Sequence, residues 1–206
     1  MNSRQEPSVR RLLATRTASV HEALHAHSWI SSLQDPSLTQ DRYRLLLAAY
    51  YAFLSDLEAE RARLDCYPLL SLGDQIANLK SDLEILPGEL RTLDVKIKKP
   101  GGKRAELLGS LYVIHGAGFG AASLTRHVKR SLPDASRHYL ERGTSAATWR
   151  VMLGEIESLA GSLTDIERLV SGAAATFDSF GGFISAFCEA NQSWTARLPA
   201  SSKSPS

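Results

Sequence analysis

The chain has 206 residues, of which 43% are hydrophobic, and this is enough for one compact domain with its own core. Its 24 basic and 22 acidic residues leave a net charge of +2, too weak a field to hold a nucleic acid or a membrane surface by charge alone. We therefore expect neither as a partner. The two cysteines, Cys66 and Cys188, lie far apart and predict neither a disulfide framework nor a zinc site.

The two ends of the chain are polar. The first residues lack the apolar core of a signal peptide, and no apolar run reaches the roughly 18 residues of a membrane span. Together with the cysteine usage, this predicts a cytoplasmic protein. We expect a disordered tail at 1–7 and another, rich in Ser and Pro, at 197–206, with one helical domain at 8–196 between them.

Within the predicted domain, apolar residues recur at helical spacing, and no segment alternates convincingly as a strand would. The first helix contains Leu13 and Leu24. A long helix follows Ser37-Leu38-Thr39, and a stretch with the composition of an exposed loop occupies 94–104. After the first, the predicted helices cover about 39–65, 71–86, 107–128, 134–142, 145–160 and 162–194.

The last of these helices carries apolar residues on one face: Ile166, Leu169, Val170, Ala173, Phe177 and Phe180. The patterns together predict an all-α domain of about seven or eight helices. In such a domain, ligand sites lie between helices.

The first predicted helix places His21 and His25 four residues apart, on one face, with Leu13 and Thr17 on the same stripe. Arg10 also returns to that face. A neutral imidazole is a common ligand of iron and zinc when a neighbouring acceptor fixes which nitrogen is free. The spacing alone is more typical of partly exposed polar residues on an amphipathic helix, and a zinc site would need a third and a fourth ligand. Both interpretations stay open at this point.

Three glycines, at positions 116, 118 and 120, interrupt the apolar stretch 107–128. In a helix interior they cost roughly 2–3 kcal/mol relative to alanine. One explanation is a bulky ligand lying against bare backbone, and the other is close helix packing at Gly116 and Gly120. A phosphate loop is excluded, because no strand precedes the glycines and no Lys-Ser/Thr follows them.

The histidine stripe of the first helix and the glycines at 116, 118 and 120 are more specific together than either is alone. Leu13, Thr17 and His21, followed about ninety residues later by LGSLYVIHGAGFG, resemble the heme oxygenase family, in particular its bacterial, bacteriophytochrome-associated branch. The resemblance covers about residues 8–190 and follows family order and spacing. It extends to Arg42-Tyr43, the Tyr50/Tyr51/Phe53 run, 79–83, Trp149-Arg150 and 173–177.

The resemblance implies a single multi-helix heme-oxygenase-like domain that binds heme. In the family, the histidine at the position of His21 is the proximal ligand of the heme iron, and the glycines at Gly116 and Gly120 bring the backbone close to the other heme face. The helix that carries them is kinked in the family, because a flat macrocycle needs a wall without side chains and a kink leaves room for bound dioxygen. We also expect Thr17, Tyr112 and Ala117 to line the heme pocket, and Arg10 to pair with the propionates.

The implied activity is oxidative cleavage of heme to biliverdin, carbon monoxide and iron, with dioxygen and reducing equivalents. Heme is then both cofactor and substrate. The implied partners are an external electron donor of ferredoxin or flavoprotein type and a bilin-accepting phytochrome. Two alternatives remain: a non-catalytic heme-binding or heme-sensing protein of the same fold, and a helical interaction module without heme.

Two residues depart from the family pattern. Ala117 stands where many relatives have a polar residue, and an alanine side chain cannot hold a distal water. His115 stands where the bacterial branch more often has an acid, and it points away from the face of Gly116. Both departures bear on turnover more than on heme binding.

Overall fold

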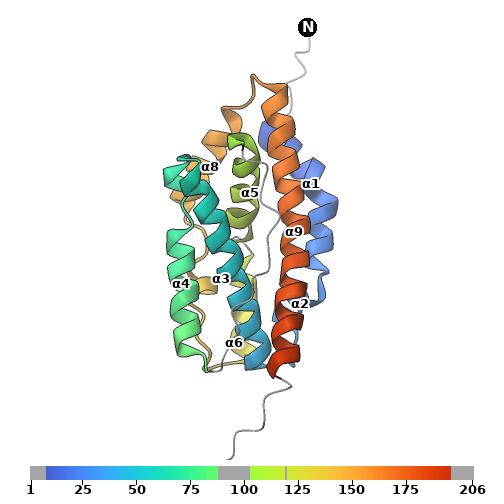
Figure 1. Cartoon of the computed structure of the whole chain (residues 1–206), viewed down its shortest axis with the longest axis vertical. Helices are drawn as coiled ribbons and strands as arrows, with labels where there is room; N and C mark the ends of the chain where they lie inside the picture. Colours follow the sequence, from blue (N-terminus) through green and yellow to red (C-terminus); the bar gives the residue numbers. More distant parts are fainter. Residues whose placement is uncertain (1–7, 88–102, 119, 196–206) are drawn as a thin grey trace, which may run out of the picture.

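The computed structural model describes residues 8–87, 103–118 and 120–195, and within these ranges the chain is helical with no strand. The all-α prediction is confirmed. Short helices lie between some of the longer ones along the chain (Figure 1). In order they are α1 (Val9–His25), α2 (Ser28–Ser31), η1 (Ser32–Gln34), α3 (Gln40–Arg63), η2 (Pro68–Leu70), α4 (Gly73–Ile85), α5 (Arg104–Ala117), α6 (Ala121–Ser131), α7 (His138–Arg142), α8 (Ala146–Glu157) and α9 (Leu163–Thr195).

Four of the described helices begin at a hydroxyl cap. The side chains of Ser8, Thr39, Ser145 and Ser162 each accept a hydrogen bond from the backbone N–H three residues further on. These bonds satisfy N–H groups that have no partner inside the helix. The predicted start near Thr39 is therefore confirmed.

The core is built around α9, the longest helix, against which α1, α3 and α5 pack. In the view of Figure 1, α5 and α1 stand on its two sides. Every residue of the predicted apolar face of α9 is buried: Ile166, Leu169, Val170, Ala173, Phe177 and Phe180.

The backbones of α5 and α9 approach closely at two glycines. A Cβ added at Gly109 would overlap the carbonyl oxygen of Leu169, and one added at Gly172 would overlap that of Glu106. Because backbone cannot move aside as a flexible side chain can, only glycine allows this approach. Sequence reasoning assigned no role to Gly109 or Gly172.

The apolar spacing predicted one helical stretch at 107–128, which the resemblance implied to be kinked, and the structure divides it into two helices. Helix α5 ends at Ala117 and α6 begins at Ala121. A Cβ at Gly118 would lie 2.5 Å from the backbone nitrogen of Thr144, so the connection to α8 runs directly against the break. A contact with a distant loop ends the helix here, and local apolar spacing carries no sign of that contact.

Other boundaries differ less. The helix predicted at 134–142 begins only at His138, and the short α2 was not predicted. The tails at 1–7 and 197–206 and most of the loop at 94–104 lie outside the described residues. Both cysteines are free and buried. Among the described helices, none combines the length and apolar character that crossing a membrane requires.

Candidate functional site

The first site residue, His21, lies on α1 where that helix leaves the core. Leu13 and Thr17, on the same stripe, are buried, whereas His21 is exposed. The Thr17 hydroxyl donates to the Leu13 carbonyl at 2.9 Å. The helix itself therefore uses the polar group of Thr17, while the imidazole one turn further on faces outward.

The imidazole of His21 has two ring neighbours. Its edge meets the ring of Phe177 on α9, with centroids 5.6 Å apart, and its Nε2 lies 3.1 Å from Nε2 of His25. Partial burial lowers the pKa of His21, and the nearby His25 lowers it further. The neutral form, which binds metals, is thereby favoured. Among the described residues no group of three or more His, Cys, Asp or Glu could hold a metal ion, so the zinc interpretation gains no third ligand.

The N-terminal end of α1 is held by α8. Both carboxylate oxygens of Glu157 accept backbone N–H groups, from Val9 at 3.3 Å and from Arg10 at 3.2 Å. A carboxylate at a helix N-terminus satisfies unpaired N–H groups and interacts favourably with the helix dipole. A second tie, the ion pair between Arg16 and Glu167, joins α1 to α9. Sequence reasoning missed Glu157, because nothing in the sequence connects positions 148 residues apart.

Arg10 and Tyr112 lie near each other, from α1 and α5. Burial raises the pKa of Tyr112, and the positive charge of Arg10 opposes that rise. The Arg10 side chain is exposed. The structure thus brings two of the predicted site residues near each other, one from α1 and one from α5.

The wall opposite His21 was predicted at Gly116 and Gly120. A Cβ added at Gly116 would come no closer than 4.0 Å to any neighbour, the nearest being Cη2 of Trp149, and one at Gly120 no closer than 3.5 Å. Close helix packing therefore does not explain these two glycines, in contrast to Gly109 and Gly172 on the α5–α9 contact.

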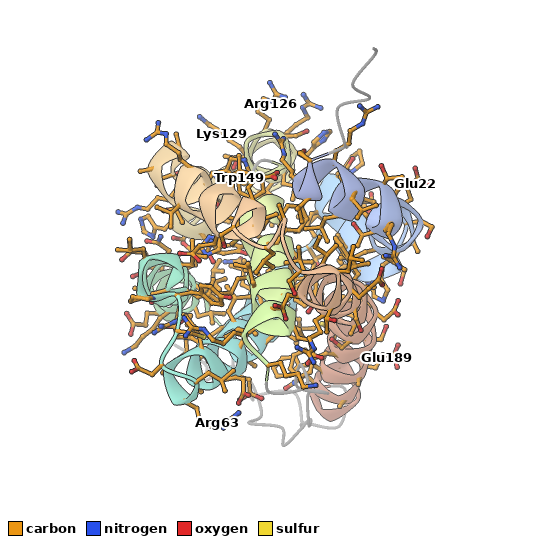
Figure 2. The ribbon with its side chains drawn as sticks, turned by 90° about the horizontal axis from the view of Figure 1, so that it is seen from above. Glu22, Arg63, Arg126, Lys129, Trp149 and Glu189 are labelled. Atoms are coloured by element: carbon orange, nitrogen blue, oxygen red, sulfur yellow. The ribbon has the colours of Figure 1, made fainter. Side chains whose placement is uncertain are left out.

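Trp149 joins this wall from α8. Its ring lies tilted against that of Tyr112, with centroids 5.6 Å apart and planes 31° apart. Figure 2 shows Trp149 on the side of α8 that faces α5, while Glu22 on α1 and Arg126 and Lys129 on α6 project outward. The sequence contained Trp149 within a family match but assigned it no role.

His115 directly precedes Gly116 on α5 and is held in place by contacts with two other segments of the chain. It is 2% exposed, and its Nε2 lies 3.1 Å from the carbonyl oxygen of Leu70, while its own carbonyl accepts a 2.6 Å bond from Thr144. Burial lowers the pKa of His115, and the bond to Leu70 and the charge of Glu58 partly offset this. The prediction that His115 points away from the Gly116 face agrees with this placement.

Ala117 is exposed and lies at the mouth of a cavity of about 40 Å³. The cavity extends behind it between α3, α4, α6 and α7, with Tyr50 and Tyr139 among its lining residues. As the sequence predicted, position 117 itself contributes only a methyl group.

These features define an all-helical protein in which an exposed histidine on α1 and the glycine-containing end of α5 belong to two helices that both pack against the long core helix α9. A comparison with protein families gives the identification: the heme oxygenase family model matches residues 8–186, so the chain belongs to the heme oxygenase family. No curated protein sequence matches the chain.

Solved structures show the same fold. The heme oxygenase of Leptospira interrogans superposes with a TM-score of 0.66 at 18% identity, over 87% of this chain and all of that one. Heme oxygenase-1 of the cyanobacterium Synechocystis, solved in complex with heme, gives a TM-score of 0.67 at 15% identity, over 92% of this chain and 96% of that one. These comparisons do not distinguish the bacteriophytochrome-associated branch from others.

The residues present suit heme, which the family binds. An exposed imidazole, whose pKa is lowered by partial burial, is available on α1, and its described ring partners are His25 and Phe177. Gly116 and Gly120 present backbone without a side chain, and neither is required by a tight packing contact. The ring of Phe177 on α9 lies beside His21, and that of Trp149 on α8 lies beside Tyr112.

Proposed function

We propose that this protein is a heme oxygenase that cleaves heme to biliverdin, carbon monoxide and iron, with His21 as the axial ligand. The observation that carries the proposal is the exposed imidazole of His21, whose pKa is lowered by partial burial, at the end of an otherwise buried stripe in a chain of this family. When bound, heme supplies the dioxygen chemistry and is itself the substrate. Reducing equivalents come from an external donor of ferredoxin or flavoprotein type.

In this proposal each site residue has a defined task. His21 offers Nε2 to the iron after turning away from His25, and the ring of Phe177 supports the imidazole from α9. Gly116 and Gly120 leave the other face of the ligand free of side chains. Tyr112 and Thr17 belong to the walls of the pocket, and the exposed guanidinium of Arg10 pairs with a propionate at its edge.

The second candidate is a heme-binding or heme-sensing protein that does not turn over. Ala117 is the observation that favours it, because proton delivery normally needs a polar group near the reacting oxygen and this side chain has none. A bilin-accepting phytochrome as partner and a cytoplasmic location stay predictions.

The deciding experiment is a hemin titration of the purified protein followed by visible spectroscopy, with a reductant then added in air. We expect a saturable one-to-one Soret band that decays into a bilin absorbance. A stable Soret band, when the same reductant drives a known heme oxygenase, supports the non-catalytic candidate. Absence of a saturable band rejects both and leaves the helical interaction module.

The axial role is tested with His21→Ala, and His127→Ala on α6 serves as the matched control. We expect the first change to remove the axial bond and shift or abolish the Soret band, and the second to leave the spectrum unchanged. A normal spectrum in His21→Ala would reject His21 as the ligand, whatever the activity of the protein.

A further inference from the structure

The end of α5 is held by a hydroxyl group from a distant segment of the chain. The carbonyl oxygen of His115 accepts the backbone N–H of Gly118 at 3.2 Å and the hydroxyl of Thr144 at 2.6 Å. In a continuous α-helix this carbonyl would accept the N–H four residues further on. Because α5 ends at Ala117, the carbonyl is available to a donor from outside the helix, and Thr144 supplies that donor from the connection between α7 and α8.

The segment that carries Thr144 fits against this helix end because two glycines leave it room. A Cβ added at Gly118 would overlap the Thr144 hydroxyl oxygen and lie 2.5 Å from the Thr144 backbone nitrogen. From the other side, Gly143 has a φ of +53°, and a Cβ there would lie 3.1 Å from the Gly118 carbonyl oxygen. Glycine adopts a positive φ and allows such an approach without strain. The two glycines thus bring the Thr144 hydroxyl within reach of His115.

His115 is bonded to a second distant segment through its side chain. The residue is buried, and its Nε2 lies 3.1 Å from the carbonyl oxygen of Leu70 in η2. Its imidazole is therefore tied to η2, and its carbonyl to the connection before α8. Gly116 follows His115 directly, so the backbone of the predicted pocket wall is held from two sides by the contacts of one residue.

The connection that carries Thr144 also leads into the aromatic part of the wall. Ser145 caps α8 by accepting the backbone N–H three residues further on, at 3.0 Å. On the first turns of α8, Trp149 has its Cη2 atom 4.0 Å from the Cβ position of Gly116. Because Thr144 lies just before α8, its bond to His115 joins the start of α8 to the end of α5 beside the predicted pocket.

We propose that Thr144 is a positioning residue of the heme pocket: its hydroxyl fixes where α5 ends, and with that the place of the Gly116 backbone against which heme would lie. A hydroxyl has a single proton to donate, and hydrogen bonds weaken steeply when they bend, so the bond sets both a distance and a direction. The placement of the helix end is a property of the heme-free chain, whereas its consequence for heme rests on the proposed function.

The first test uses the heme-free protein and Thr144→Val, which keeps the shape of the side chain but has no hydroxyl. The backbone N–H groups of Gly118, Gly120 and Ala121 form the turns at this helix end. We expect them to exchange with solvent about 10-fold faster or more than in the wild type, measured by NMR, because the helix end opens more readily without its anchor. Leu111, in the middle of α5, should keep its exchange rate.

Two further variants complete this test. Thr144→Ser keeps the hydroxyl and should restore the wild-type exchange rates. Thr148→Val is the matched control, since the Thr148 hydroxyl lies 2.8 Å from Ser145 Oγ in the first turn of α8 and its loss should leave the end of α5 unchanged. Unchanged exchange in Thr144→Val, or a Thr144→Ser variant that behaves like Thr144→Val, would overturn the proposal.

The second test uses the hemin-loaded protein. We expect the hemin dissociation constant to rise at least about 10-fold in Thr144→Val and to stay close to the wild-type value in Thr144→Ser and Thr148→Val, because a displacement of about 1 Å at a positioning residue has large effects on a bound substrate. The C–O stretching frequency of the ferrous carbon monoxide complex, which responds to groups near the bound gas, should change in Thr144→Val alone. Chemical denaturation checks that each variant is folded under the conditions of the titration.

The pocket role of Thr144 and the proposed function fail separately. If Thr144→Val has faster exchange at the end of α5 but normal hemin affinity and a normal C–O frequency, Thr144 is a helix cap only. That result overturns its role in the pocket and leaves the heme oxygenase proposal intact. If the wild type does not bind hemin, both proposals fail, and the titration shows this before any variant is made.

Discussion

The two ends of α5 use glycine for different purposes. At the first, Gly109 lets the backbone of α5 lie against the carbonyl of Leu169, and Gly172 does the same from α9. At the other, Gly116 and Gly120 border no tight contact, whereas Gly118 between them packs against Thr144. Gly109 and Gly116, about two helical turns apart on α5, thus differ: the first allows a close backbone contact and the second leaves bare backbone. A glycine in a sequence shows that a side chain is absent, and only its neighbours show why.

The largest effect is expected from Gly109→Ala, which tests the close contact between α5 and α9. The new Cβ would overlap the Leu169 carbonyl and lie 2.7 Å from the nitrogen of Ala173, so α5 and α9 must separate. We expect the free energy of unfolding to fall by about 3 kcal/mol or more, measured by chemical denaturation. Gly154→Ala on α8, where nothing lies within 4 Å, is the control and should gain up to about 1 kcal/mol. Equal stability of the two variants would show that the α5–α9 approach is not tight.

A second, smaller effect is expected from His115, which joins the packed side of α5 to Leu70. Because burial lowers its folded-state pKa below the ordinary value of 6.5 for histidine, the unfolded chain binds the proton first as the pH falls. Stability is therefore complete above about pH 6.5 and declines below it, by up to about 1.4 kcal/mol per pH unit until the folded histidine protonates.

Denaturation curves of the wild type and His115→Gln between pH 7.5 and 5 test this. Glutamine keeps a donor for the Leu70 carbonyl but does not titrate, so its stability should fall less over this range. Parallel curves for the two proteins would assign the acid sensitivity to other groups.

The smallest effect on stability is expected at the open end. Gly116→Ala places a methyl group where the nearest atom is 4.0 Å away, so the unfolding free energy should stay the same or rise by up to about 1 kcal/mol. The affinity for hemin should nevertheless fall at least about 10-fold, which is about 1.4 kcal/mol, because the methyl group occupies the wall of the pocket. If Gly116→Ala lost stability but kept its affinity for hemin, Gly116 would be a packing residue and not part of the pocket wall.

Much of the fold follows from local pattern. The apolar spacing in α9 predicted its buried face correctly, and Thr39 marked the start of α3, because periodicity and capping depend on residues within a few turns. The break at Gly118 did not follow, since it depends on the approach of Thr144. The start of α7 at His138 likewise depends on Asp82, 56 residues away.

The residues of the candidate site also fall into two groups, those that the sequence identified and those that it did not. His21, Gly116 and Gly120 could be chosen from the sequence, because a histidine stripe and an interrupted helix are visible in the order of residues. Glu157, Trp149 and the cavity residues Tyr50 and Tyr139 could not be assigned roles, because each acts through contacts between helices.

The sequence by itself determined that this protein is all-α, that it resembles heme oxygenases, and that position 117 carries no polar group. The tertiary structure alone decided which glycines pack and which stand bare, where α5 ends, and which residues line the cavity behind Ala117. The physical reason is the distance along the chain over which each property is set. Helix formation and side-chain chemistry depend on neighbouring residues, whereas close backbone approach and cavity lining arise only when distant segments meet.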